Sequence, residues 1–314
     1  MLTVQNIHHA REDIADIINE TPLFSSTQLS KITGNRMFFK AEHLQRTGAF
    51  KIRGATNKVK QVVKEGASFV TAASSGNHGQ AVSYIANVLG IDATIVIPQD
   101  ATVSKVNAIQ TYKGKIEKCG TTSADRLPRA QVLAKENNGI YIPPYDDPFI
   151  IAGQGTVGLE ILQQLDEVEV VVVPIGGGGL ISGILTAIKE TNPSVTVIGV
   201  EPESANDTLL SLEEGEIVSI PETKTIADGL RTSEPGTMTF PIVQKYVDNI
   251  VTVSESEIHQ ALFFVLERMK QLIEPSSAVA VAAAMFDKLG VKDKNVVCVL
   301  SGGNVDVRKL GELM

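Results

Sequence analysis

The stretch VVVVPIGGGGLISG, residues 170–183, constrains the fold of this chain more than any other. Its four valines have no polar neighbour, which predicts a strand buried on both faces, as in a parallel sheet. Four glycines follow, although a tight strand-to-helix turn needs only one or two. The extra glycines indicate that something approaches the backbone closely. Free N–H groups at the start of the next helix favour an anion there, most often a phosphate.

Composition narrows the class of protein. The chain has 314 residues, 43% of them hydrophobic, so we expect two lobes and a sizeable core. A net charge of −8 argues against a nucleic-acid or anionic-membrane surface. Cys119 and Cys298 are too few for a disulfide framework and lack the spacing of metal ligands. No apolar run reaches the length of a membrane span, and the N-terminus lacks a signal-peptide core. We therefore expect a cytoplasmic protein without a nucleic-acid or membrane partner.

Predicted strands and helices alternate along the chain, which indicates an α/β protein with parallel sheets covered by helices on both faces. A long helix is expected over residues 256–273, and residues 217–241 give few signals of regular structure. Three polar, glycine-containing stretches follow predicted strands: Ser74–Gln80, Gly176–Gly179 and Ser301–Asn304. Sites in open α/β sheets lie beyond the carboxyl ends of strands, so we expect these stretches to meet at one site.

Two alternatives remain open on the residues alone. Gly177 and Gly179 fit the first two glycines of a dinucleotide fingerprint, and Ser182 stands where its third small residue belongs. Glu201 ends the next predicted strand, where a ribose-binding acid would lie. A nicotinamide oxidoreductase would use these residues, but it would not use Lys51 or the other two loops. The second alternative is a non-catalytic α/β protein with a phosphate pocket.

Pyridoxal phosphate (PLP) needs a lysine, a phosphate cup and partners for its ring. The chain supplies all three in five motifs: TGAFKIRGA (47–55), SSGNHGQA (74–81), IAGQGT (151–156), PIGGGGL (174–180) and SGGN (301–304). Together and in this order they closely resemble the fold-type II PLP enzymes, above all the threonine/serine dehydratases and serine racemases. The resemblance covers nearly the whole chain. It implies a tryptophan synthase β-like fold, in which two open parallel-sheet lobes hold the cofactor in the cleft between them.

The resemblance also implies a cofactor site. Lys51 would join PLP as a Schiff base, and Asn77 would hydrogen-bond the ring's 3-hydroxyl. Ser301 would face the ring nitrogen as a neutral partner, which favours prompt loss of a β-substituent. The phosphate would lie against the backbone of Gly176, Gly177, Gly178, Gly179 and Leu180.

Substrate residues follow from the same resemblance. The N–H groups of the loop Ser74, Ser75, Gly76 and Asn77 would meet the substrate carboxylate, and Arg126 aligns with a position near the substrate. Ser75, on the face opposite Lys51, could return a proton to Cα. We expect His78, in contrast, to bond to backbone rather than act as an acid or base.

The segment 201–207 matches the racemase branch of the family, where two carboxylates and a main-chain oxygen hold a divalent cation. Glu201, the Ala205 carbonyl and Asp207 would supply oxygens suited to Mg²⁺, Mn²⁺ or Ca²⁺. The alternative is an acidic cluster stabilised by a helix dipole. Gln80 and Asn304 match positions near a nucleotide-effector site in some racemases.

The implied reaction is β-elimination, which converts L-threonine to 2-oxobutanoate, or L-serine to pyruvate, with release of ammonia. Serine racemisation is the close alternative, favoured by Ser75, and threo-3-hydroxyaspartate is a third candidate substrate. We expect a large lobe at 1–67 and 147–314, a small mobile lobe at 68–146, and a homodimer. The chain does not extend past Met314 into a regulatory domain, so feedback inhibition through one is not expected.

Overall fold

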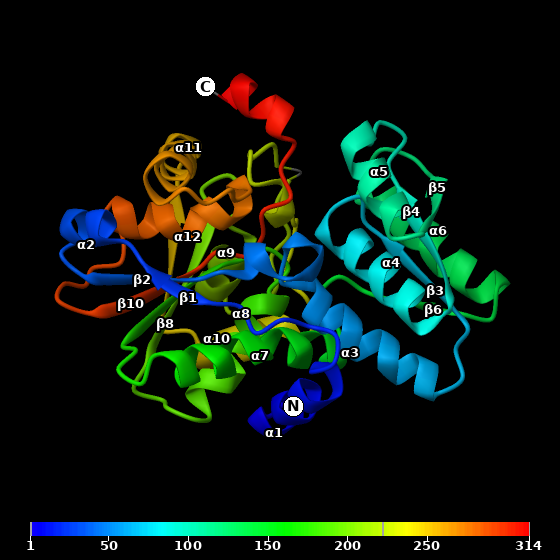
Figure 1. The fold of residues 1–314 in the computed structure, drawn as a ribbon, viewed down its shortest axis with the longest axis horizontal. Helices are drawn as coiled ribbons and strands as arrows, with labels where there is room; N and C mark the ends of the chain where they lie inside the picture. The colour runs from blue at the N-terminus through cyan, green and yellow to red at the C-terminus, as the bar shows by residue number, and fades with distance from the viewer. Residues whose placement is uncertain (1, 222, 314) are drawn as a thin grey trace.

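A computed structural model describes residues 2–221 and 223–313 and places two sheets side by side (Figure 1). The larger sheet has six strands in the order β1-β2-β10-β7-β8-β9, and β1 is antiparallel to β2 while the other neighbours are parallel. Its strands are β1 (Leu23–Ser25), β2 (Arg36–Lys40), β7 (Val170–Pro174), β8 (Thr196–Pro202), β9 (Asn249–Val253) and β10 (Asn295–Val299). The expectation of parallel sheets is confirmed.

The valine run forms β7, near the centre of the larger sheet, and every residue of it is buried. Val170 and Val172 point into the core on one face, and Val171 and Val173 point into the core on the other. This is why no polar residue interrupts the run. The first face is covered by α11 (Glu255–Phe264) and α12 (Pro275–Met285), and the second by α7 (Pro148–Gln164), α8 (Gly179–Lys189) and α10 (Thr239–Tyr246).

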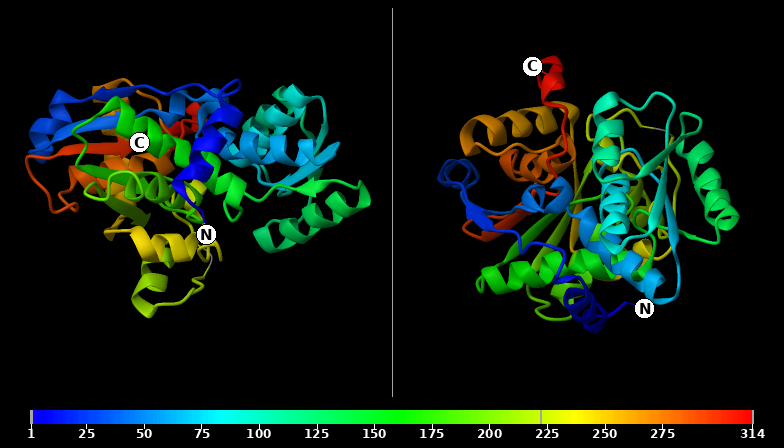
Figure 2. Two further views of the ribbon diagram at one scale, coloured as in Figure 1. Left: turned by 90° about the horizontal axis from the view of Figure 1, so that it is seen from below. Right: turned by 45° about the vertical axis from the view of Figure 1, so that its right-hand side comes forward.

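The smaller sheet has four parallel strands in the order β5-β4-β3-β6. They are β3 (Phe69–Ala73), β4 (Asp92–Ile97), β5 (Lys115–Lys118) and β6 (Ile140–Tyr141), connected by α4 (Asn77–Leu89), α5 (Val103–Thr111) and α6 (Ser123–Glu136). Figure 1 and the left view of Figure 2 both show this unit standing to one side of the larger sheet.

The helix α3 (Lys51–Lys64) connects the two units. Its apolar residues Ile52, Val59 and Val62 belong to the core of the smaller sheet, while the helix also packs along α7. That contact is backbone to backbone, since a side chain at Gly153 would put its Cβ 2.6 Å from Cα of Gly54. The glycines of two sequence motifs therefore serve helix packing. The lobe boundaries at residues 67/68 and 146/147 stay predictions.

The remaining elements lie at the edges of the larger unit. They are α1 (Val4–Ile14), α2 (Thr27–Thr33), η1 (Glu42–Leu44), η2 (Arg46–Gly48), α9 (Asp207–Glu214), η3 (Asp228–Leu230), η4 (Val265–Met269) and η5 (Val307–Leu313). The long helix expected to 273 was wrong, because α11 ends at Phe264 and one π-helical turn, η4, follows. Within the described residues, no helix is both long and apolar enough to cross a membrane.

Candidate active site

Lys51 is the first residue of α3 and lies between the two sheets. Its Nζ donates a hydrogen bond to the carbonyl of Pro144 (2.8 Å) and lies 5.1 Å from the centre of the Phe50 ring. Burial lowers the pKa of Lys51 to about 8, although the Glu274 carboxylate opposes the shift. The neutral, nucleophilic form of the amine is therefore far more populated near neutral pH than in an ordinary lysine, although the charged form still predominates.

The linker 143–147 leads from β6 back to α7 and crosses the glycine turn. A Cβ at Gly177 would lie 2.4 Å from ring atoms of Tyr145, and one at Gly179 would lie 2.9 Å from Cβ of Tyr145. The linker thus contacts Lys51 through Pro144 and the glycines through Tyr145. Neither residue was among the predicted site residues, because the cluster PPYDDP indicates only a turn.

The glycine turn joins β7 to the start of α8. Gly178 has φ +87°, in the left-handed region, and a Cβ there would lie 2.8 Å from Thr239. Leu180 is buried in the first turn of α8. The first N–H groups of a helix have no partner within it, so this backbone can receive a phosphate. The glycines let Tyr145 and Thr239 pack directly on this backbone, and the N–H groups at the start of α8 are the feature that fits a phosphate.

Ser301 follows β10 and is brought next to α3 by backbone contacts. Phe50 N–H donates to the Ser301 carbonyl (3.1 Å), and Gly303 N–H donates to the Gly48 carbonyl (2.8 Å). The buried Ser301 hydroxyl lies 3.1 Å from that of Ser277. A hydroxyl in this place is a neutral hydrogen-bonding group, as a partner of the cofactor's ring nitrogen would be.

Asn77, the first residue of α4, joins the two units by hydrogen bonds. Its Nδ2 donates to Glu274 Oε1 (2.7 Å), and its Oδ1 accepts from Asn304 Nδ2 (2.8 Å). Asn304 also donates to the Thr47 carbonyl (2.7 Å). Burial, followed by the charge of Asp228, raises the pKa of Glu274 to about 8. Sequence reasoning missed Glu274, because an acid before a proline marks the start of a helix and says nothing of burial.

The loop Ser74–Asn77 turns tightly into α4. Ser74 Oγ accepts a hydrogen bond from Gly76 N–H (3.2 Å), and all four residues of the loop, Ser75 included, are half-buried. Arg126 lies on α6, where its guanidinium donates to the Thr121 carbonyl (3.0 Å). Its place at the substrate stays a prediction.

His78 is buried, and its Nε2 donates to the Ile142 carbonyl (2.9 Å). Burial and the nearby Lys51 charge lower the pKa of His78 to about 3. The ring is therefore neutral and anchors α4 to the chain after β6. The expectation of a backbone-bonded histidine is confirmed.

The predicted cation ligands lie where β8 ends and α9 begins. The Glu201 carboxylate accepts hydrogen bonds from the N–H groups of Thr208 (3.0 Å) and Leu209 (2.9 Å). Burial and Asp207 raise the pKa of Glu201 to about 8, and burial, with a smaller contribution from Glu234, raises that of Asp207 to about 7. Ala205 is fully buried beside them. In the described part of the chain, no group of three or more His, Cys, Asp or Glu is placed to hold a metal.

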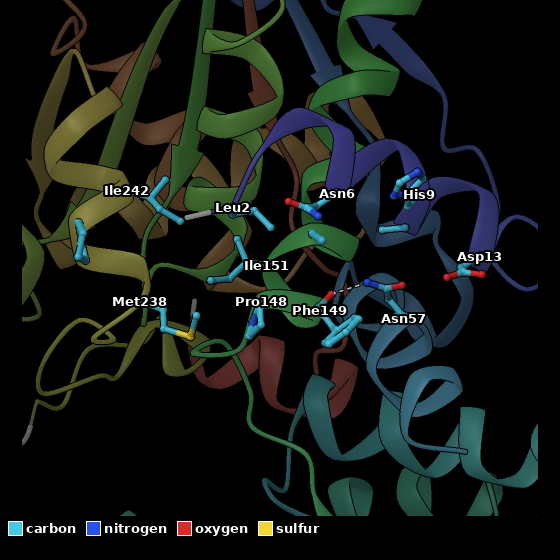
Figure 3. A pocket seen from close by; sticks show the side chains of 13 residues that line it. Leu2, Asn6, His9, Asp13, Asn57, Pro148, Phe149, Ile151, Met238 and Ile242 are labelled. Atoms are coloured by element: carbon cyan, nitrogen blue, oxygen red, sulfur yellow. Dashed lines mark hydrogen bonds between the residues drawn. The ribbon is translucent and has the colours of Figure 1, made fainter. Parts of the chain in front are cut away.

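A cavity of about 770 Å³ lies away from these residues (Figure 3). Its lining comes from α1, α3, α7 and α10 and is largely apolar, with Phe149, Ile151, Met238 and Ile242 among its members. None of the predicted site residues lines it. The cavity therefore gives no support to the predicted site, which stays a prediction and lies around Lys51, where titratable groups and the start of α8 come close together.

Comparison with known proteins decides between the cofactors. A family model described as "Pyridoxal-phosphate dependent enzyme" matches residues 14–302. The chain belongs to this family. An L-threonine ammonia-lyase of Thermotoga maritima is 42% identical over 100% of this chain and 78% of its own length. An L-threo-3-hydroxyaspartate ammonia-lyase of Saccharomyces cerevisiae is 41% identical over 99% of this chain and 96% of its own. The solved structure of maize serine racemase superposes with a TM-score of 0.95 at 38% identity, over 99% of this chain and 96% of that one.

Membership in the PLP family confirms the fold-type II assignment and sets aside the nicotinamide and non-catalytic alternatives. The geometry agrees, since the Glu201 carboxylate is buried against α9 and is not free to meet a ribose. The relatives carry the names of both ammonia-lyases and racemases, so the family alone does not choose between those reactions.

Proposed function

We propose that this protein eliminates water from L-threonine and L-serine, with PLP joined to Lys51, to give 2-oxobutanoate or pyruvate and ammonia. The observation that carries the proposal is the half-buried Lys51 side chain, whose amine has a pKa of about 8 and is connected through one linker to the glycine turn. The names of the ammonia-lyase relatives support elimination.

The residues around Lys51 offer a partner for the phosphate, the ring nitrogen and the 3-hydroxyl group of PLP. The backbone of Gly176–Gly179 and Leu180 would hold the phosphate, and Ser301 would face the ring nitrogen. Asn77 would turn its amide from Glu274 to the ring's 3-hydroxyl. When bound, PLP supplies an electron sink for the charge left at Cα of an amino acid.

Lys51 is the base for the Cα proton. An amine whose pKa is close to the working pH can both take and return a proton, and Lys51 meets that condition. The N–H groups of Ser74–Asn77 at the start of α4 would bind the substrate carboxylate. Because this loop belongs to the smaller sheet, movement of that unit towards the larger one would exclude water from the cleft. The released enamine hydrolyses to the 2-oxo acid and ammonia.

Further parts of the proposal concern partners and effectors. Glu201, the Ala205 carbonyl and Asp207 would hold Mg²⁺, Mn²⁺ or Ca²⁺, because two buried carboxylates need a counter-charge. A homodimer follows from the resemblance, and a location in the cytoplasm is proposed because the two cysteines are free. A nucleotide effector near Gln80 and Asn304 is proposed on the same ground.

Serine racemisation is the second candidate, and Ser75 is the observation that favours it. The half-buried Ser75 lies in the loop that faces the cleft, where its hydroxyl could give a proton to the Cα face opposite Lys51. Both activities share the first proton transfer, so they can coexist in one site. Elimination of water from threo-3-hydroxyaspartate, followed by hydrolysis of the enamine to the 2-oxo acid and ammonia, is a third candidate, supported by the yeast relative.

The first test is Lys51→Ala. We expect loss of the visible absorbance of Lys51-bound PLP and a fall in turnover of about 10³-fold or more, since both the covalent link and the base are removed. Visible spectra and keto-acid assays with L-threonine, L-serine and threo-3-hydroxyaspartate measure both effects. A variant with wild-type turnover would overturn the proposal.

The second test is Ser75→Ala. We expect D-serine formation from L-serine to fall by about 10²-fold while pyruvate formation changes little, because only the returning proton is lost. Chiral chromatography and a pyruvate assay on the same reaction separate the two products. If D-serine and pyruvate formation fell equally, Ser75 would not be the group that gives a proton to the Cα face opposite Lys51.

A further inference from the structure

The carboxylate of Asp146 binds the start of a helix 91 residues away. Its Oδ2 accepts hydrogen bonds from Thr237 N–H (3.0 Å) and Thr237 Oγ1 (2.8 Å). Its Oδ1 accepts from the N–H groups of Met238 (2.8 Å) and Thr239 (3.3 Å). These donors precede or begin α10, where N–H groups have no partner within the helix. Asp146 therefore caps α10 from a distant segment, through four hydrogen bonds to one half-buried carboxylate.

The segment that Asp146 caps also contacts the glycine turn, through the side chain of Thr239. Thr239 is fully buried, and its Oγ1 donates to the Gly177 carbonyl (2.8 Å) and accepts from Gly236 N–H (2.9 Å). A Cβ at Gly178 would lie 2.8 Å from the Thr239 side chain. Thr239 thus holds the Gly177 carbonyl, and with it the peptide plane that also carries the Gly178 N–H.

Asp146 directly follows Pro144 and Tyr145, the two linker residues that contact Lys51 and the glycine turn. The Pro144 carbonyl accepts the Lys51 hydrogen bond, and Tyr145 packs on Gly177 and Gly179. The Asp146 side chain therefore connects the segment 237–239, which bonds the glycine turn through Thr239, to the linker 143–147, which contacts Lys51 and the same turn. We propose that Asp146 is a positioning residue of the cofactor site, which fixes the phosphate-binding turn relative to the Lys51 amine. This inference rests on the proposed function, since it assumes that PLP occupies that cleft.

Asp147 provides a matched control. It is the next residue and also caps a helix, because its Oδ1 accepts from Phe149 N–H (2.8 Å) and Ile150 N–H (3.2 Å) of α7. Its Oδ2 forms an ion pair with Lys58 Nζ at 2.6 Å. It has the same chemistry as Asp146, but its bonds go to α7 and α3 and not to the segment behind the glycine turn. Loss of either carboxylate should destabilise the protein, whereas only loss of Asp146 should alter the site.

The experiment compares Asp146→Ala, Asp146→Asn and Asp147→Ala in the full-length protein. PLP is removed and titrated back, and its dissociation constant and visible spectrum are measured together with the melting temperature. For Asp146→Ala we expect the dissociation constant to rise about tenfold or more, with a shifted spectrum. Asp146→Asn should give a smaller rise, because its oxygen keeps two bonds while its NH₂ group faces Thr237 N–H. Asp147→Ala should lower the melting temperature and change PLP binding less than about twofold.

A second variant keeps the inference testable if Asp146→Ala does not fold. Thr239→Val removes the hydroxyl that donates to Gly177 at nearly constant volume and should weaken PLP binding in the same direction. Combined with Asp146→Asn, it should cost less than the sum of the single effects, because both act through one segment. Wild-type PLP binding in Asp146→Ala, or in both Asp146→Asn and Thr239→Val, would overturn the inference, as would equal weakening in Asp147→Ala. A wild-type protein that takes up no PLP would overturn the proposed function itself.

Discussion

Two groups of buried charges differ in their balance. Beside the start of α3, Lys40, Glu42, Arg53 and Glu160 form a neutral set in which Arg53 bonds both carboxylates, Glu42 at 2.7 Å and Glu160 at 2.5 Å. Lys40 adds a second bond to Glu160, also 2.5 Å. At the end of β8, Glu201 and Asp207 are equally buried, but their described partners are N–H groups and the Thr232 hydroxyl.

The difference appears in the ionisation of two glutamates. Burial acts to raise the pKa of both, yet Arg53 and Lys40 hold that of Glu160 below its ordinary value. Burial and Asp207 together raise the pKa of Glu201 to about 8. Burial alone therefore does not decide the charge state of an acid; the charges buried with it do. The first set is neutral as it stands, whereas the second pair, which has no positively charged partner among its described contacts, keeps its protons to a higher pH.

The largest expected effect comes from breaking the balanced set. Arg53→Met leaves two buried carboxylates without their shared partner, and we expect the free energy of unfolding to fall by about 3–5 kcal/mol. Urea denaturation of the cofactor-free protein measures the loss. Lys64→Met, which removes an exposed pairing with Asp13, is the control and should change little. A loss below about 1 kcal/mol for Arg53→Met would remove the contrast between the two groups.

The second prediction concerns the effect of a divalent cation on Glu201 and Asp207. Mg²⁺, Mn²⁺ or Ca²⁺ at a hundred times its dissociation constant should stabilise the protein by about 2.7 kcal/mol. The melting temperature with and without a chelator reports this, and Asp207→Asn should abolish the response. If none of the three ions shifts the melting temperature of the wild type, the segment is an acidic helix start without a metal.

The smallest effect concerns pH in the presence of a chelator. Carboxyl groups ionise near pH 4 in the unfolded chain, whereas Glu201 and Asp207 have raised pKa values of about 8 and 7 in the fold. The folded state holds more protons between these limits, so stability should decline as the pH rises towards 8. Glu201→Gln should flatten this decline, because the residue no longer titrates. A steeper decline in the variant would show that Glu201 is not the titrating group.

The sequence predicted well what depends on local pattern. The valine run and the glycines gave β7 and the turn before α8, and the motif order indicated the family. Helix α10 was missed, because its start is capped by Asp146 from a distant linker and residues 237–239 offer no local capping signal. The helix expected to 273 stops early because Lys270 adopts φ 59° and Glu274 N–H bonds the Gly302 carbonyl at 3.1 Å. Glu274, Tyr145 and Asp146 enter the site through contacts between segments far apart, which no local pattern encodes.

The strand order has a consequence for biosynthesis. The last strand, β10, lies between β2 and β7, so the amino-terminal strands reach the rest of the larger sheet only through residues 295–299. A nascent chain still lacking those residues exposes two unpaired strand edges on the ribosome. Ser301 emerges later still, so the residues around Lys51 come together only after residue 301 has left the ribosome.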